Sequence, residues 1–183
     1  MDRYLQLFEA ENKPDSLSLA KLPYDVHELE PVLSEANVKY HYHTLSKAYV
    51  DRYNNGEGDS DFNYGGAMLH NLWWAQLRAP GGANKPHGDI AALIDSRFGS
   101  YEEFRSKFAE TAMTLQGSGW CYLSKSGDIK TLKNQDYVKS VLLPIDLWEH
   151  SWTYDFAKPS KPQYLKNIWR IINWDVINHR LSA

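Results

Sequence analysis

The chain has almost no cysteine, little net charge and no long apolar run. Its 183 residues include a single cysteine, Cys121, which excludes an internal disulfide framework. The formal net charge of −3 gives no reason to expect nucleic acid as a partner. Any attraction of an anionic substrate must therefore come from a local basic rim.

No stretch of apolar residues approaches the length of a membrane span, so no membrane partner is expected. The segment from Met1 to Lys21 is polar and carries acids, unlike a signal peptide. The sequence therefore predicts a cytoplasmic protein, or one in the cytoplasm of a host cell.

Aromatic and aliphatic residues, in contrast, are plentiful. Hydrophobic residues make up 43% of the chain and aromatic residues 14%, enough to enclose a polar site in a medium of low dielectric constant. A chain of this length can hold one sizeable core or two small lobes. Cys121 follows Trp120 in an apolar segment, so we interpret it as a packing residue rather than a nucleophile.

A helical hairpin is predicted for the first part of the chain. Three-four spacing favours one long helix over 32–54, a polar loop follows at 56–59, and a second helix rich in tryptophan and leucine covers 64–77. We assign residues 1–78 to this N-terminal domain. Residues 1–21 form an arm that is either a surface segment or an extra helix.

An α+β domain is predicted for the rest. Residues 79–88 are rich in proline and glycine and indicate a linker. Helices are expected over 89–98, 101–115 and 162–181, and strands over 120–123, 130–132 and 141–145. The C-terminal domain, residues 89–183, should therefore contain a three-stranded antiparallel sheet.

Four residues that can bind a metal stand in apolar, aromatic surroundings. Asp146 and His150 are four residues apart, where an apolar strand gives way to a predicted helix, so both can reach one ion. Alternatively, Asp146 caps that helix and His150 is a core histidine. His41 and His70 lie upstream among bulky residues. Three imidazoles and one carboxylate suit a redox-active first-row metal such as manganese or iron.

Longer strings around these residues resemble the iron/manganese superoxide dismutase family from residue 22 onward. The string Asp-Leu-Trp-Glu-His at 146–150 is similar to the family's signature. Further matches, in order, are Leu-Pro-Tyr at 22–24, Ala-Tyr-Val at 48–50, Gln-Gly-Ser-Gly-Trp at 116–120, Asn-Gln-Asp at 134–136 and Ile-Asn-Trp at 172–174. The resemblance implies an α+β fold: an N-terminal long helical hairpin, a C-terminal α/β lobe, and the metal between the lobes.

The resemblance also implies an enzyme that converts superoxide to dioxygen and hydrogen peroxide by alternating reduction and oxidation of one metal ion. The implied metal ligands are His41, His70, Asp146 and His150. Gln135 would hydrogen-bond the solvent on the metal, and Tyr49 would sit at the substrate funnel. Trp120 and Trp148 would wall the pocket. Glu149 would hydrogen-bond a histidine across a twofold interface, so we expect a homodimer through the Glu149/His150 region.

The position of the glutamine bears on the metal. In iron-type members it usually lies four residues before the second ligand, which here is Gly66. The glutamine here is Gln135, which is the manganese-type arrangement. We therefore favour one manganese ion per subunit, with iron as the alternative. Lys161 resembles the family's basic residue at the funnel rim, or is a solvated charge.

Two residues depart from the family. Leu45 and Thr153 stand where the family usually carries a histidine and a tyrosine that pair across the dimer. Loss of one partner leaves a buried polar group unpaired, whereas loss of both can be nearly neutral. We therefore expect an active enzyme with a repacked gateway and altered proton supply or product inhibition.

Two other functions are alternatives to a superoxide dismutase. One is a catalytically weak or inactive protein of this fold that serves as a scaffold or interaction module. The other is a metal-dependent oxygenase or hydrolase, which is disfavoured because a tight aromatic wall leaves little space for an organic substrate.

Overall fold

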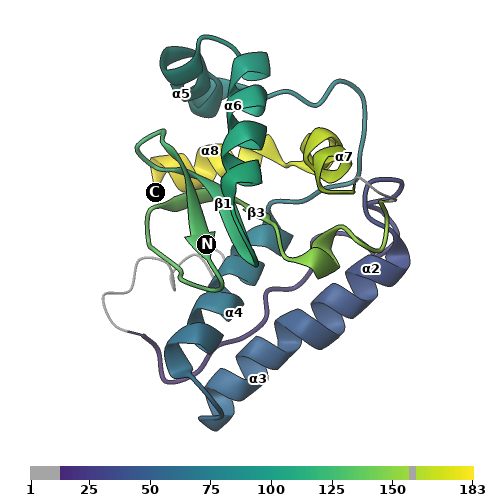
Figure 1. The fold of residues 1–183 in the computed structure, drawn as a ribbon, viewed down its shortest axis with the longest axis vertical. Helices are drawn as coiled ribbons and strands as arrows, with labels where there is room; N and C mark the ends of the chain where they lie inside the picture. The colour runs from purple at the N-terminus through teal and green to yellow at the C-terminus, as the bar shows by residue number, and fades with distance from the viewer. Residues whose placement is uncertain (1–12, 157–159) are drawn as a thin grey trace.

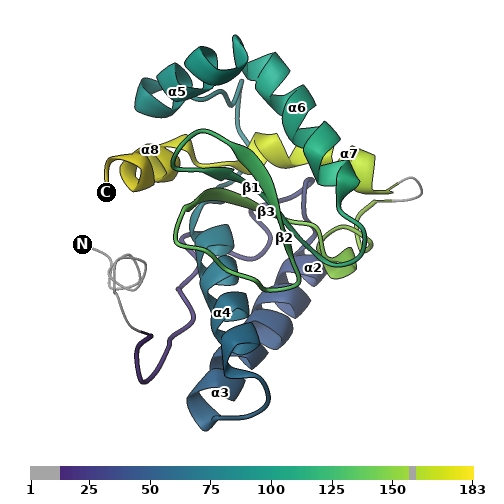
Figure 2. The ribbon, with the colours of Figure 1, turned by 60° about the vertical axis from the view of Figure 1, so that its left-hand side comes forward.

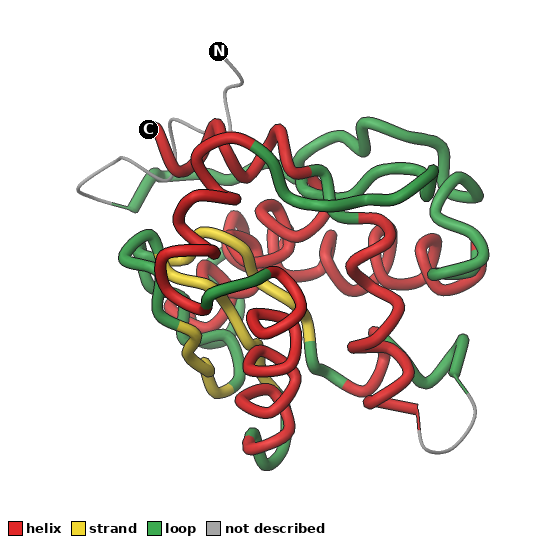
Figure 3. Tube along the Cα trace, turned by 90° about the horizontal axis from the view of Figure 1, so that it is seen from above, coloured by secondary structure: helices red, strands yellow, loops and turns green. Residues whose placement is uncertain are grey.

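Helices surround a small antiparallel sheet in the computed structural model, which describes residues 13–156 and 160–183 (Figure 1). The helices are α2 (Glu35–Tyr40), α3 (Lys47–Asn55), α4 (Ser60–Ala75), α5 (Gly88–Phe98), α6 (Tyr101–Thr114), α7 (Ser160–Asn167) and α8 (Trp174–Ser182). The strands are β1 (Gly119–Ser124), β2 (Ile129–Lys133) and β3 (Val141–Asp146). Strands form only a small part of the fold, with helices around them (Figure 3). This is the α+β architecture that the sequence predicts.

The N-terminal hairpin begins with a capped helix. Ser34 Oγ accepts a hydrogen bond from Asn37 N at 3.2 Å, which satisfies one of the first free amides of α2. α2 continues through the π-helical turn η1 (His41–Ser46) into α3, which ends at Gly56 in the left-handed conformation, φ 67°. The helical segment thus covers 35–55, close to the predicted 32–54. Its one irregularity, the wide turn, starts at His41.

The sheet has β1 at its centre, paired antiparallel with β2 on one side and β3 on the other. Every residue of β1 and β3 is buried, in agreement with their apolar sequences. α6 packs against β1 and β2, whereas α4 and α8 contact β3 (Figure 2). The end of β3, where Asp146 lies opposite Trp120, is therefore held close to the second helix of the hairpin.

The C-terminal segment differs from the single helix predicted over 162–181. It is divided into α7, the 3-10 turn η3 (Ile168–Ile171) and α8. Ile172 leaves the helical path to form a β-bridge with Leu77, and Asn173 N donates to Gln76 O at 2.7 Å. Asn173 then caps α8 with its side chain. Tertiary pairing with the end of α4 thus outweighs the helical periodicity of this segment.

The described part of the N-terminal arm, residues 13–21, contains no helix or strand and is bonded to the hairpin. Two side-chain amides hold its backbone. Asn54 bonds both N and O of Leu17, at 2.7 and 2.9 Å. Asn71 accepts from Ala20 N at 2.8 Å and donates to Ser18 O at 3.0 Å. Residues 1–12 of the predicted arm lie outside the described residues.

One hydrophobic core cluster contains side chains from both halves of the chain, among them Trp74 of α4 and Trp120 of β1. The division into domains at 1–78 and 89–183, with a linker at 79–88, stays a prediction. Across residues 13–156 and 160–183, no helix combines the length and the apolar character needed to cross a membrane.

The replacement Asn71→Ala should test how firmly the arm is attached. Asn71 is fully buried, so its replacement leaves Ala20 N and Ser18 O without their hydrogen-bond partner. We therefore expect the free energy of unfolding to fall by about 1–3 kcal/mol. Urea unfolding measures the change. The control is Asn55→Ala, an exposed helical residue that bonds only to Glu57 among the described residues and should shift stability by less than about 0.5 kcal/mol. Equal effects of the two replacements would contradict this account.

Candidate metal centre

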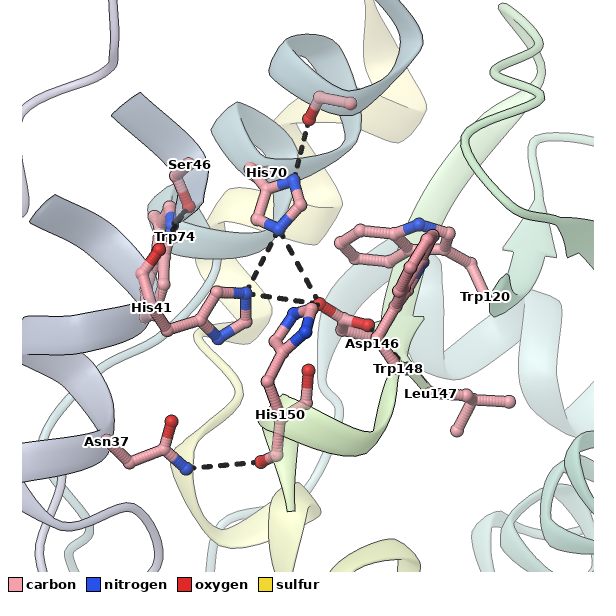
Figure 4. Close-up of polar contacts among 12 residues, drawn as sticks. Asn37, His41, Ser46, His70, Trp74, Trp120, Asp146, Leu147, Trp148 and His150 are labelled. Atoms are coloured by element: carbon pink, nitrogen blue, oxygen red, sulfur yellow. Dashed lines mark hydrogen bonds and ion pairs between the residues drawn. The ribbon is translucent and has the colours of Figure 1, made fainter. Parts of the chain in front are cut away.

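The four predicted ligands converge between the hairpin and the end of the sheet (Figure 4). His41 opens the π-helical turn η1, and His70 lies on α4. Asp146 is the last residue of β3, and His150 lies in the 3-10 turn η2 (Glu149–Ser151). The turn η2 replaces the full helix that the sequence predicts after the strand, yet it still directs His150 back toward Asp146.

The ligand atoms form a tight group, which we call the donor cluster (His41, His70, Asp146, His150). Each residue offers one ligand atom, and all four atoms lie within 4.8 Å of one another. The Oδ2 atom of Asp146 is 3.2, 3.7 and 3.6 Å from the Nε2 atoms of the three histidines, in chain order. The Nε2 atoms of His41 and His70 are 3.0 Å apart.

Two atoms of the donor cluster indicate that a cation fits there. Asp146 Oδ2 and His150 Nε2 are buried and have no hydrogen-bond partner in the described part of the chain. Buried polar atoms normally have partners, so such a pair requires an explanation. His70 Nδ1 lies 2.7 Å from Gly66 O and donates to it, which leaves its Nε2 as a lone pair facing the cluster. The residues present therefore suit a metal ion.

The pKa values of the ligand side chains favour the protonation states that bind a cation. Burial lowers the pKa of His41, and burial together with the neighbouring His41 lowers the pKa of His70 to about 3. Burial alone would raise the pKa of Asp146, but its close contacts with His150 and His41 outweigh burial and hold that pKa below its usual range. At neutral pH the metal-free cluster therefore contains an ionised carboxylate beside two neutral imidazoles, the forms that bind metals.

Aromatic rings pack against the imidazoles of His41 and His70, and a hydroxyl holds the backbone of His41. The ring of His41 meets Trp74 edge-on at 4.8 Å, and His70 meets Trp120 in the same way at 5.1 Å. Trp74 Nε1 donates to Ser46 Oγ at 2.9 Å, and Ser46 Oγ donates to the carbonyl of His41 at 2.8 Å. Sequence reasoning missed Ser46. Its one signal was its distance of five residues from His41, the spacing of a π-helical turn.

The predicted catalytic residues Tyr49, Gln135 and Trp120 form one hydrogen-bonded chain. Trp120 Nε1 donates to Gln135 Oε1 at 2.9 Å, and Gln135 Nε2 donates to Tyr49 OH at 3.0 Å. The indole thereby fixes the orientation of the amide. The Tyr49 ring stacks on His70 with ring centroids 5.2 Å apart, so the chain of bonds ends beside the donor cluster.

Two adjacent glycines on α4 make room for this chain. A Cβ atom at Gly65 would lie 1.8 Å from Gln135 O, and a Cβ atom at Gly66 would lie 2.5 Å from the ring of Tyr49. Contacts this short are not tolerated, so both positions exclude any side chain in this arrangement. Because the two glycines have no side chains, the Gln135 loop and the Tyr49 ring can both pack against the same turn of α4.

The remaining two predicted residues lie on the outer side of the cluster. Trp148 is partly exposed and stacks on His150, with ring centroids 5.9 Å apart. Glu149 is exposed and is not one of the four residues of the donor cluster. Both residues border a surface hollow of about 520 Å³, which Lys161 lines as well. Burial lowers the pKa of the Lys161 ammonium, while Glu149 opposes that shift.

The two residues that depart from the family lie near this region without bonding to each other. Leu45 is half-buried on η1, and Thr153 is exposed after η2. The next residue, Tyr154, is 54% exposed and packs on Tyr40 with ring centroids 5.8 Å apart. The structure thus places a tyrosine pair on the surface of the chain, close to the helical turn that carries His41.

Comparison with known proteins agrees with this geometry. The model for the alpha-hairpin domain of iron/manganese superoxide dismutases matches residues 16–61, and the model for the C-terminal domain of the same proteins matches residues 86–180. Together the two matches extend over both halves of the chain: the first ends at the start of α4, and the second begins after that helix.

Curated relatives are similar over most of their length. The superoxide dismutase [Mn] of Mycolicibacterium smegmatis is 34% identical over 194 residues, covering 91% of this chain and 93% of its own. Superoxide dismutase [Mn] 1, mitochondrial, of Arabidopsis thaliana is 33% identical over 191 residues, covering 87% and 82%. The mitochondrial superoxide dismutase [Mn] of Capsicum annuum is 36% identical over 192 residues, covering 87% and 83%. The chain therefore belongs to the iron/manganese superoxide dismutase family.

Proposed function

We propose that manganese is the metal of this superoxide dismutase and that His41, His70, Asp146 and His150 hold it. The observation that carries the proposal is the convergence of four ligand atoms within 4.8 Å, two of them without a hydrogen-bond partner among the described residues. A scaffold or interaction module has no need of such a cluster.

The protein side chains would supply protons and exclude water. A bound ion would provide one-electron oxidation and reduction, which no side chain of the cluster performs by itself. Conversion of two superoxide ions to dioxygen and hydrogen peroxide consumes two protons. Burial raises the pKa of Tyr49, so its hydroxyl is protonated at neutral pH. Because this hydroxyl accepts from Gln135, it keeps its own proton to donate. We assign Tyr49 and Gln135 to proton supply on this basis.

Trp120 and Trp148 would close the site from two sides. Trp120 is fully buried between His70 and Gln135, where it leaves no room for bulk water. Trp148 covers His150 from the solvent side. The Lys161 ammonium would attract superoxide locally, since the overall charge of −3 attracts no anion.

The position of the active-site glutamine, at residue 135 and not at residue 66, favours manganese over iron. The Cβ atom of any residue at position 66 would collide with the Tyr49 ring, so a glutamine on α4 could not coexist with this Tyr49 position. Gln135 fills that role from the C-terminal half instead. The relatives named above carry manganese in their names, in agreement with this preference.

A homodimer through the Glu149/His150 region is part of the proposal. Glu149 is exposed within its own chain, directly beside His150, and so is available to a second subunit. A carboxylate from the partner would orient the imidazole from its far side, which is the usual arrangement for metal-bound histidines.

Superoxide decay should be followed after the metal-free protein is loaded with manganese or, in parallel, with iron. We expect fast catalysed decay with manganese and slower decay with iron. Asp146→Ala removes the only carboxylate of the cluster and should weaken metal binding by more than about 100-fold, the upper range for loss of an outer-sphere partner. Catalysis with iron alone would refute the choice of manganese. Stoichiometric binding of both metals without catalysis would favour a scaffold.

The replacement Gln135→Leu tests the assigned proton supply. The metal ligands are unchanged, so binding of manganese should be retained, whereas the turnover rate should fall by roughly 10–100-fold because Tyr49 loses its partner. Stopped-flow decay of superoxide measures the rate. Gln116→Leu, an exposed glutamine, serves as the matched control and should behave as the wild type. Equal turnover of the two variants would rule out this role for Gln135.

The metal-free protein should lose stability in acid. Because the pKa values of His41 and His70 are lower in the folded state, the unfolded chain binds more protons below about pH 6.5. The free energy of unfolding should therefore fall as pH decreases from about 6.5 toward 3. Urea unfolding with a chelator present measures this, and His70→Gln should make the dependence shallower. An identical pH dependence of wild type and variant would contradict the lowered pKa of His70.

A further inference from the structure

One buried side chain connects the segments that carry the first and the fourth ligand. Asn37 is 1% exposed and lies one helical turn before His41, and its backbone carbonyl accepts a hydrogen bond from His41 N. Its side chain points the other way, across to the segment after β3 (Figure 4). There its Nδ2 atom donates to Ser151 O at 3.3 Å, the carbonyl directly after His150.

A carboxylate reinforces this link. Asn37 Nδ2 also donates to Asp155 Oδ2 at 2.8 Å, and the same oxygen accepts from Ser34 N at 3.2 Å. Asp155 thereby places a negative charge at the N-terminal end of α2, where the helix dipole favours it. The segment 151–155 is thus tied to α2 at two points, one beside His150 and one at the start of the helix.

His150 depends on such a link more than the other ligands do. Its side chain is 17% exposed, whereas those of His41, His70 and Asp146 are at most 1% exposed. It also lies in η2, a 3-10 turn of only three residues, while the others lie on long helices or within the sheet. A metal site needs its donors held to within about 0.5 Å, and a short turn alone does not supply that rigidity.

We propose that Asn37, supported by Asp155, is a positioning residue of the metal centre that fixes the Nε2 atom of His150 relative to that of His41. This inference rests on the proposed metal ligands. It also explains how the site tolerates Leu45 and Thr153. The segment after the last ligand is fastened to α2 within its own chain by the buried Asn37 amide, which bonds Ser151 O and the partly buried Asp155.

The test compares manganese affinity with stability. Asn37→Ala should lower the affinity for Mn²⁺ roughly 10-fold or more, as loss of an outer-sphere contact does. Asp155→Ala keeps the bond to Ser151 O and should cause a smaller fall. Affinity is measured by competition with a chelator, and the stability of each metal-free variant by urea unfolding.

The control is Asn178→Ala. Its amide likewise bonds two backbone groups, Ile90 N and His87 O, both at 2.8 Å, but at the start of α5. It should lower stability without changing the affinity for Mn²⁺. If Asn37→Ala also lowers only stability, the residue is structural and the inference is wrong. If Asn37→Ala does not fold, unchanged affinity in Asp155→Ala overturns the inference. No binding of Mn²⁺ by the wild type would instead overturn the proposed ligands themselves.

Discussion

The structure depends on keeping one carboxylate ionised in the interior. Asp146 has no solvent exposure, and moving such a group out of water costs several kcal/mol unless other groups compensate. Compensation comes from both halves of the chain: the imidazole of His41 from the hairpin, the imidazole of His150 from η2, and the amide of Trp148, which donates to Asp146 Oδ1 at 2.9 Å. Neither half contains the complete set of groups. The contact between α4 and β3 is therefore what assembles the site.

Packing and hydrogen bonds from the protein itself hold these groups in place. His41 and His70 are each enclosed by an aromatic ring and held by a bond from their own helical segment. The residues proposed to supply protons are held in the same manner, since Gln135 is bonded at both ends of its amide. The site is thus preorganised, and binding energy need not be spent on ordering these side chains.

The sequence predicted which residues meet but not the backbone that joins them. The strands followed from apolar periodicity, whereas the donor cluster and the place of the metal between the two lobes followed from the resemblance of longer strings to the iron/manganese superoxide dismutase family. His150 lies in the 3-10 turn Glu149–Ser151 instead of a full helix. Trp148 before it is extended, and its amide donates to Asp146 Oδ1, a local bond that competes with helix formation. The break at Ile172 and the role of Asn37 were not predictable, since their partners lie far away in the sequence and no local pattern marks them.

The glycine pair on α4 also has an evolutionary consequence. Any side chain at Gly65 displaces the loop of Gln135, and any side chain at Gly66 displaces the ring of Tyr49. Transfer of the glutamine from the loop to the helix therefore cannot proceed by single substitutions that each preserve the hydrogen bond between Gln135 and Tyr49. The intermediates along that route would lack an ordered proton donor. A chain with this arrangement is consequently confined to its present glutamine position by steric exclusion.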